Sequence, residues 1–375
     1  MTEPKLAFLK DCGPEPPPVK FWPALVVTGE EIEAEVASLS SMALPPGTYR
    51  RSFIIHPSSV EPGRALAPGI DVAVNILLPG AVTAVAKNSA SQVAFCIRGK
   101  AVCHVGSSAM AFEERDVWNI PSLNSYSYQN TGSESAVFLS YSNAPLLKKL
   151  CVYYVAEESA SSQAANRGES SGNEQTMAKP SRELATNAAV GTAGARVLGY
   201  EYLVDIDVVP SPALLWRWEE VSQHLDSVEH LGGAAGKGYR GRHLVVLYNP
   251  ATGRRIGTTP SFFASIAQFP PNRVDVPHRH TSAAINYIFA GDGQSTVDGH
   301  RFYWKAGELM LSAPGWAVHN HSSGNKGCNI LTIQDHPLQI AMESLVWQES
   351  IKGQTVKLGA ERGIQTNIAQ SLAGN

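Results

Sequence analysis

Four histidines form two closely spaced pairs in the second half of the chain. His278 and His280 are two residues apart in VPHRHT, and His319 and His321 are two residues apart in PGWAVHNH. Side chains two residues apart on a β-strand point to the same face of a sheet. Two histidines on one strand and one from a later strand can therefore meet inside a small barrel and bind a divalent metal. A lone histidine is more often a surface or core residue, but this paired spacing favours a metal site.

The segments that must position these histidines predict a mainly β protein. Short apolar runs rich in Val, Ile, Phe and Tyr, broken by Gly, Pro and Asn, extend over residues 49–142 and again over 242–345. Runs of this length are typical of strands in an all-β barrel or sandwich. The two regions also match each other, with Gly99 aligned to Gly291, 192 residues later in the sequence. A match of this kind predicts a duplicated β-module.

The rest of the chain divides where the composition changes. The first 45 residues combine several prolines with a helical stretch at 30–41, which predicts an arm that packs onto another part of the protein or a second subunit. Residues 156–196 are nearly free of aromatic and large apolar side chains, as linkers are, and a helical pattern begins at about residue 213. The expected organisation is an N-terminal arm (1–45), a first barrel (46–150), a linker with a helical segment (151–235), a second barrel (236–345) and a C-terminal tail (346–375).

Composition and charge exclude several classes of function. The chain has 375 residues, which suits two domains, and a net charge of −3, which disfavours a nucleic-acid partner. Its five cysteines are scattered with no CxxC pair, which favours reduced thiols and a cytoplasmic location. The N-terminal residues lack the apolar core of a signal peptide, and no apolar run is long enough to span a membrane.

The phrases that carry the histidines resemble the two cupin motifs. PNRVDVPHRH, with Gly291-Asp292-Gly293, resembles the first motif, and Gly307 with PGWAVH resembles the second. Together with the duplication, the chain resembles a bicupin, and VVLYNP, HRHTSAA and GWAVHNH are similar to phrases of the gentisate 1,2-dioxygenase group. That group includes salicylate and 1-hydroxy-2-naphthoate dioxygenases. The resemblance implies two jelly-roll β-barrels with flanking helices, Fe(II), a small aromatic substrate with O2, and a homo-oligomer, either a dimer or a tetramer.

The resemblance also implies roles for individual residues. It makes His278, His280 and His319 the iron ligands, and it makes His321 a histidine beside the third ligand. His321 lies two residues along the same strand, so it is either a candidate acid or base for the substrate hydroxyl or a group that supports the ligand without a proton role. Asp335, in IQDHPL, becomes either an active-site aspartate that orients a histidine or a loop aspartate that caps a turn. The positions expected to bind substrate are Arg242, Phe263, Asn286 and Trp316.

Two departures from the group change what is expected. Asn286 stands where the group usually has an arginine, so a bidentate carboxylate clamp is lost. The substrate then either lacks the usual carboxylate or binds it through Arg242 or Arg279. In the first module, Ala86, Asn88 and Tyr126 align with the three ligands. We therefore expect one metal per chain, in the C-terminal barrel, and a first barrel that is structural or serves as a lid and dimer surface.

Three kinds of protein fit this pattern. Three neutral imidazoles leave the full 2+ charge on a metal and about three open positions, which suits a ring-cleaving dioxygenase with an anionic, bidentate substrate. A non-oxidative cupin metalloenzyme (a decarboxylase, isomerase or lyase) is the first alternative, but such enzymes more often keep a glutamate near Ala284 or Ile285. A non-catalytic ligand-binding bicupin is the second, but these proteins tend to lose the ligands of both halves.

Overall fold

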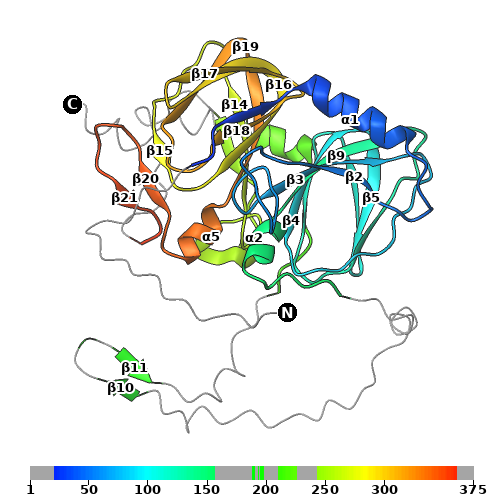
Figure 1. Cartoon of the computed structure of the whole chain (residues 1–375), viewed down its shortest axis with the longest axis horizontal. Coiled ribbons are helices and arrows are strands. Elements are labelled where there is room, and N and C mark those ends of the chain that lie inside the picture. Colours follow the sequence, from blue (N-terminus) through cyan, green and yellow to red (C-terminus); the bar gives the residue numbers. More distant parts are fainter. Residues whose placement is uncertain are drawn as a thin grey trace, which may run out of the picture.

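Two β-modules lie side by side in the computed structural model, as Figure 1 shows. The structure describes residues 21–156, 188–190, 193, 195–197, 210–225 and 243–360. The first module comprises β2 to β9, and the second comprises β13 to β19. A small hairpin, β10 (Ala188–Val190) with β11 (Ala195–Val197), lies in the segment between them. The prediction of a mainly β protein is confirmed.

The first β-module consists of two sheets with a shared apolar core. Its six-stranded sheet has the order β12-β7-β4-β9-β3-β2, and a smaller sheet has the order β6-β5-β8. Aromatic side chains fill the space between the sheets, with Phe112 stacked on Trp118 at a centroid distance of 4.0 Å. The strands are β2 (Arg50–Ile54), β3 (Asp71–Leu77), β4 (Gln92–Arg98), β5 (Lys100–Val105), β6 (Ser108–Glu113), β7 (Val117–Ile120), β8 (Tyr126–Gln129) and β9 (Ala136–Ser142).

The second β-module repeats this plan with longer strands. Its large sheet has the order β1-β18-β16-β19-β14-β13, with β17 paired to β16, and a three-stranded sheet has the order β15-β20-β21. The strands are β13 (His243–Val246), β14 (Phe263–Phe269), β15 (Arg279–His280), β16 (Ala284–Val297), β17 (His300–Lys305), β18 (Leu309–Ala313), β19 (His319–Gln334), β20 (Val346–Gln348) and β21 (Val356–Lys357). The predicted C-terminal tail thus begins with β20, a strand beside the second module.

The duplication predicted from the sequence reappears in the backbone. Gly99 and Gly291 both adopt positive φ, and a Cβ at either position would overlap the backbone of the neighbouring strand. Just before each glycine the strand register shifts, between Cys96 and Arg98 in β4 and between Ile288 and Ala290 in β16. Only glycine adopts this conformation at little cost, which explains why the two modules share it.

Each module is completed by a strand that comes from outside it. The N-terminal arm contributes β1 (Leu25–Val27), which pairs with β18 of the second module. The segment between the modules contributes β12 (Leu215–Trp216), which pairs with β7 of the first. The expected helical pattern from residue 213 therefore begins as a strand, and residues 218–225, which end this described stretch, are helical.

Short helices flank the sheets. α1 (Gly29–Ser41), close to the predicted 30–41, starts with a capping box in which Thr28 accepts from the Glu31 amide. The others are α2 (Ala144–Lys149), η3 (Pro250–Arg255) and α5 (His336–Ala341). Among the helices of the described residues, none has both the length and the apolar character needed to cross a membrane.

The two modules share one core. The largest buried cluster takes side chains from both of them, including Phe95 and Tyr287, whose ring centroids are 5.5 Å apart. Burial raises the pKa of Tyr287 well above its ordinary value, so this phenol stays neutral within the core. A continuous apolar contact of this kind, together with the two contributed strands, holds the second module and its histidines in place.

Candidate metal centre

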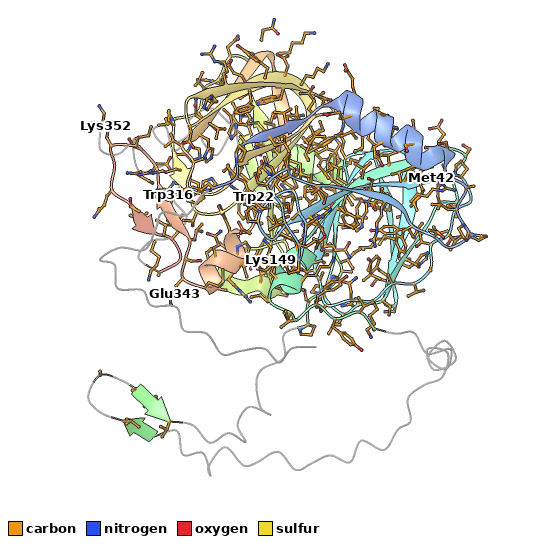
Figure 2. The ribbon with its side chains drawn as sticks, viewed as in Figure 1. Trp22, Met42, Lys149, Trp316, Glu343 and Lys352 are labelled. Atoms are coloured by element: carbon orange, nitrogen blue, oxygen red, sulfur yellow. The ribbon has the colours of Figure 1, made fainter. Side chains whose placement is uncertain are left out.

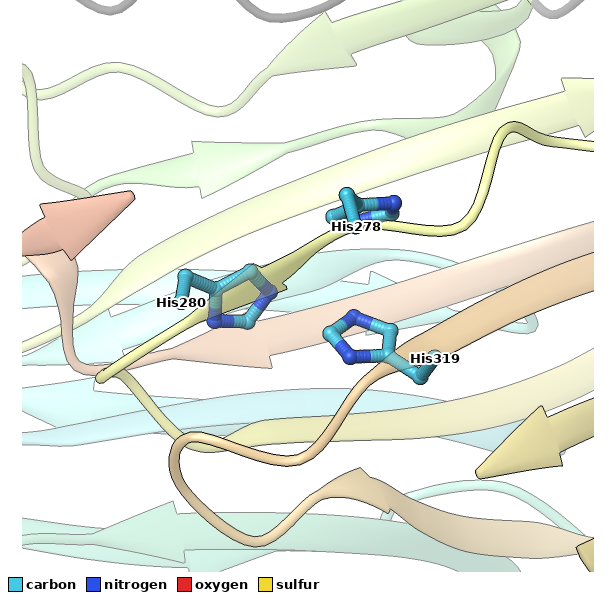
Figure 3. A group of neighbouring side chains, drawn as sticks. All are labelled: His278, His280 and His319. Atoms are coloured by element: carbon cyan, nitrogen blue, oxygen red, sulfur yellow. The ribbon is translucent and has the colours of Figure 1, made fainter. Parts of the chain in front are cut away.

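Three buried histidines meet in the second module. Figure 3 shows His278 and His280 on the chain of β15, with His319 facing them from the start of β19. One nitrogen from each imidazole lies within 4.8 Å of the corresponding nitrogens of the other two. His278 and His319 also form an antiparallel backbone bridge, which fixes the two chains at this point. Within the described residues, this is the one group of three or more candidate ligands with this spacing.

Backbone carbonyls orient all three rings. The Nδ1 atoms of His278, His280 and His319 lie 2.9, 2.9 and 3.0 Å from the carbonyl oxygens of residues 276, 282 and 317. A carbonyl only accepts hydrogen bonds, so each Nδ1 carries the proton and donates. The lone pair of each ring is then on Nε2, as metal binding requires.

All three imidazoles are buried. His278, His280 and His319 are 7%, 1% and 2% exposed. Burial, followed by the neighbouring histidines, holds the pKa of His280 well below its ordinary value. A cluster of buried imidazoles with oriented Nε2 atoms is a donor set that suits a divalent transition metal.

The first module has the same backbone arrangement without the ligands. Ala86 and Tyr126 form the bridge that His278 and His319 form in the second module. Asn88, aligned with His280, forms a bridge with Val155. Tyr128, aligned with His321, is 3% exposed and packs among the aromatic side chains of the core. Buried tyrosine rings thus stand at the two positions that align with His319 and His321.

A cavity of about 80 Å³ opens beside the three histidines. A single water molecule needs roughly 10–15 Å³ measured this way, so the cavity accommodates several ligand atoms. Its wall combines aromatic, apolar and uncharged polar side chains. The lining residues are Leu244, Phe263, Ser265, Ala267, Phe269, His278, His280, Ala284, Asn286, His319, His321, Ile330, Thr332, Gln334, His336 and Trp347.

Two of the predicted substrate-binding residues line this cavity. Phe263, at the start of β14, is 8% exposed and faces His336 with 5.0 Å between the ring centroids. Asn286, on β16, is 5% exposed and is held by two hydroxyls. Its Nδ2 donates to Ser312 Oγ at 2.7 Å, and its Oδ1 accepts from Thr332 Oγ1 at 2.7 Å. The amide is therefore part of a polar network within the barrel.

His321 also lines the cavity, whereas Asp335 lies outside the lining and binds groups elsewhere. His321 lies next to His319, with ring centroids 5.8 Å apart, and its Nδ1 is 2.7 Å from Ser295 Oγ. The carboxylate of Asp335 accepts hydrogen bonds from the Ala283 amide and from Gln339 Nε2. Burial raises the pKa of Asp335 to about 6. These contacts link β16 to α5, and the catalytic role of Asp335 stays a prediction.

Trp316 lies outside the cavity lining. The guanidinium of Arg279 lies over its ring in a cation–π contact, with Cζ 4.5 Å from the ring centroid. Arg279 Nε also donates to Gln348 Oε1, so this side chain points away from its neighbours His278 and His280, as strand alternation predicts. Figure 2 shows Trp316 beside β15. Arg242, the remaining predicted substrate residue, lies outside the described residues.

Sequence reasoning missed two residues that contact the histidine cluster. Trp347, on β20, stacks on His278 and His280 at centroid distances of 5.4 and 4.7 Å. His336, the first residue of α5, has its ring 5.8 Å from that of His280. The duplication aligns Trp347 with Val155, and the structure shows that these residues pair with the aligned residues His280 and Asn88.

Comparison with known proteins decides the fold. The structure of salicylate 1,2-dioxygenase from Pseudaminobacter salicylatoxidans superposes with a TM-score of 0.70 and 15% identity, covering 91% of each chain. The chain is a bicupin. The AraC-like ligand binding domain model matches residues 259–372 of it.

Curated relatives of this bicupin are 1,2-dioxygenases. The 5-aminosalicylate 1,2-dioxygenase of Comamonas sp is 28% identical over 130 residues, which is 34% of this chain and 33% of that protein. The gentisate 1,2-dioxygenase of Streptomyces sp is 33% identical over 119 residues, which is 30% of this chain and 32% of that protein. The aligned part of the bicupin thus spans about one third of the length of each relative. The predicted resemblance to the gentisate 1,2-dioxygenase group is confirmed.

Proposed function

We propose that this bicupin is an Fe(II)-dependent dioxygenase that cleaves the ring of a hydroxylated aromatic acid. The observation that carries the proposal is the histidine triad: three buried imidazoles with Nδ1–H bound to carbonyls, beside a cavity. The named activities of the relatives, on 5-aminosalicylate and gentisate, supply the substrate class. Structures of salicylate 1,2-dioxygenase as adducts with gentisate support the same class.

The donor set of this chain fits such a metal. His278, His280 and His319 contribute no negative charge, so a bound divalent ion keeps its full 2+ charge. That charge favours a substrate that offers two anionic oxygens, such as a hydroxy-carboxylate. A bound Fe(II) would supply open coordination positions and the redox chemistry needed to activate O2.

The chain's own residues bind and orient the substrate. Phe263 and Trp347 give the cavity aromatic walls, which exclude water and pack against an aromatic ring. His321, held through Nδ1 at Ser295 Oγ, is the candidate to take the substrate hydroxyl proton at Nε2. Trp304 Nε1 donates to the same Ser295 hydroxyl at 2.8 Å, which fixes the group that orients His321.

An oxygen-uptake assay tests the proposal. The full chain is reconstituted with Fe(II) under nitrogen and then mixed with oxygenated buffer and gentisate, salicylate, 5-aminosalicylate or 1-hydroxy-2-naphthoate. Uptake of one O2 per substrate, with a new absorbance from a ring-opened product, is expected for at least one acid. Catechol, hydroquinone and benzoate are the controls that lack either the carboxylate or the hydroxyl group.

Two other results would overturn the proposal. Turnover of an acid under nitrogen, with any divalent metal, would indicate a non-oxidative metalloenzyme. A purified protein that retains no metal and consumes no O2 after reconstitution would indicate a ligand-binding bicupin.

A further inference from the structure

One polar side chain in the cavity wall has no hydrogen-bond partner. His336 is 3% exposed, and neither its Nδ1 nor its Nε2 has a partner in the structure. Among the described residues with such buried, unpartnered side-chain atoms, His336 is the one that lines this cavity. A buried polar group without a partner is unfavourable, so a ligand that forms the missing hydrogen bond gains binding energy.

The position of His336 limits what it can contact. Its ring packs against Phe263, at 5.0 Å, and lies edge-on to His280, at 5.8 Å between centroids and 88° between planes. Trp347 closes another side at 6.0 Å. With these rings around it, His336 faces the part of the cavity next to the triad. A polar group of a ligand bound in this cavity beside the triad can supply the missing hydrogen-bond partner.

The side-chain amide of Asn286 already binds two other side chains. Both ends of its amide bind barrel hydroxyls, of Ser312 and Thr332. One N–H of its Nδ2 remains, so Asn286 cannot form the bidentate carboxylate clamp that an arginine would provide at this position. The cavity has a second polar group on the same wall segment, Gln334, but His336 is the one whose ring nitrogens lack partners.

We propose that His336 is a substrate-binding residue that donates a hydrogen bond to the carboxylate of the aromatic acid. This inference rests on the proposed function, since it assumes an acid bound at the triad. His336 takes over the polar anchoring of the carboxylate from the missing arginine with an uncharged donor. The role requires only an N–H group at this place, and a neutral imidazole has one.

Anaerobic calorimetry of the Zn(II)-loaded full chain tests this role without any turnover. The probes are salicylate, which carries the carboxylate, and catechol, which chelates a metal without one. His336→Phe keeps the ring shape and removes both nitrogens. We expect it to weaken salicylate binding about tenfold to a hundredfold, to leave catechol binding within about twofold, and to retain zinc at one per chain.

Conservative variants and a control sharpen the test. His336→Asn or His336→Gln presents an amide N–H near one ring nitrogen, so at least one of them should recover part of the salicylate affinity. His300→Phe, at an exposed position on β17, should bind both probes as the wild type does.

Several outcomes would overturn the inference. Unchanged salicylate binding in His336→Phe would do so, and so would an equal loss for salicylate and catechol, which would point to a general change in cavity shape. A wild-type protein that binds zinc but not salicylate would overturn the proposed function together with this inference. If the wild type binds salicylate and His336→Phe binds it equally well, only this inference is overturned.

Discussion

Trp347 stacks on the ring of His280, with 4.7 Å between the centroids and 21° between the planes. The same indole lies over His278, so one side chain covers two of the three predicted ligands. Trp347 is 6% exposed, and its Nε1 donates to Glu349 Oε2 at 2.7 Å. Backbone carbonyls thus hold the Nδ1 atoms of all three rings, and the indole of Trp347 covers the faces of two of them.

Trp347→Ala should lower the free energy of unfolding by about 3–5 kcal/mol, because it removes a buried aromatic side chain. It should also speed the loss of zinc to a chelator, because two imidazoles lose the surface that restricts their rotation. Urea denaturation and zinc analysis after dialysis against EDTA measure the two effects. Trp347→Phe, which keeps a ring, should show much smaller changes. Equal zinc retention in Trp347→Ala and wild type would contradict this role.

His278→Ala should abolish metal retention, since two imidazoles alone cannot hold a divalent ion against a chelator at neutral pH. Metal content per chain, measured after reconstitution and desalting, is the readout. The matched control is His300→Ala at an exposed position on β17, which should keep one metal per chain. Full metal content in His278→Ala would show that the metal binds somewhere else.

Asn286→Leu should destabilise the protein by about 1–3 kcal/mol, because the hydroxyls of Ser312 and Thr332 lose a buried partner. Replacing all three polar groups, as Asn286→Leu with Ser312→Ala and Thr332→Val, should recover much of this loss, because no unpaired group remains. Urea denaturation of both variants measures the difference. If the triple variant is less stable than Asn286→Leu, the unpaired hydroxyls of Ser312 and Thr332 do not explain the stability lost in Asn286→Leu.

Asp71, in the first module, should make stability depend on pH. Burial raises the pKa of Asp71 from 3.8 to about 7, against the opposing effect of Lys148 and Arg51. The folded protein therefore binds more protons than the unfolded chain between pH 3.8 and 7. The stability that comes from protonated Asp71 is complete below pH 3.8 and is lost as the pH rises to about 7.

Asp71→Asn removes this proton binding. The difference in unfolding free energy between variant and wild type should shift in favour of the variant by on the order of 4 kcal/mol from pH 4 to pH 8. Urea denaturation across this range measures it. Glu134→Gln, at an exposed position, is the control and should follow the wild type. Parallel curves for Asp71→Asn and wild type would mean that Asp71 is ionised in the fold at all these pH values.

The sequence predicted the triad because strand geometry is local. Alternation along β15 sends His278 and His280 to one side and Arg279 to the other, and two-residue spacing is all that this needs. The duplication was visible because Gly99 and Gly291 meet the same steric demand in each module. Fold class and ligand set thus follow from short-range rules that single motifs reveal.

The parts that sequence reasoning missed depend on contacts between distant segments. Trp347 meets His280 only because β20 returns to pair with β15, and nothing in the sequence VWQ indicates its partner. The ring nitrogens of His336 lack hydrogen-bond partners because of the side chains that pack around them, and the neighbours of His336 in the sequence do not reveal this. Trp316 was expected in the cavity, but which face of a loop a large ring occupies is decided by tertiary packing against Arg279.

The origins of β1 and β12 bear on whether either half of the chain can fold alone. Because β1 lies in the N-terminal arm, a fragment that begins after the first module would lack the edge strand of the large sheet that contains His319. A fragment that ends after β9 would lack β12, the edge strand of the large sheet of the first module. The sheet beside the triad thus depends on residues near the other end of the chain, and expressing the second module by itself would leave that sheet incomplete.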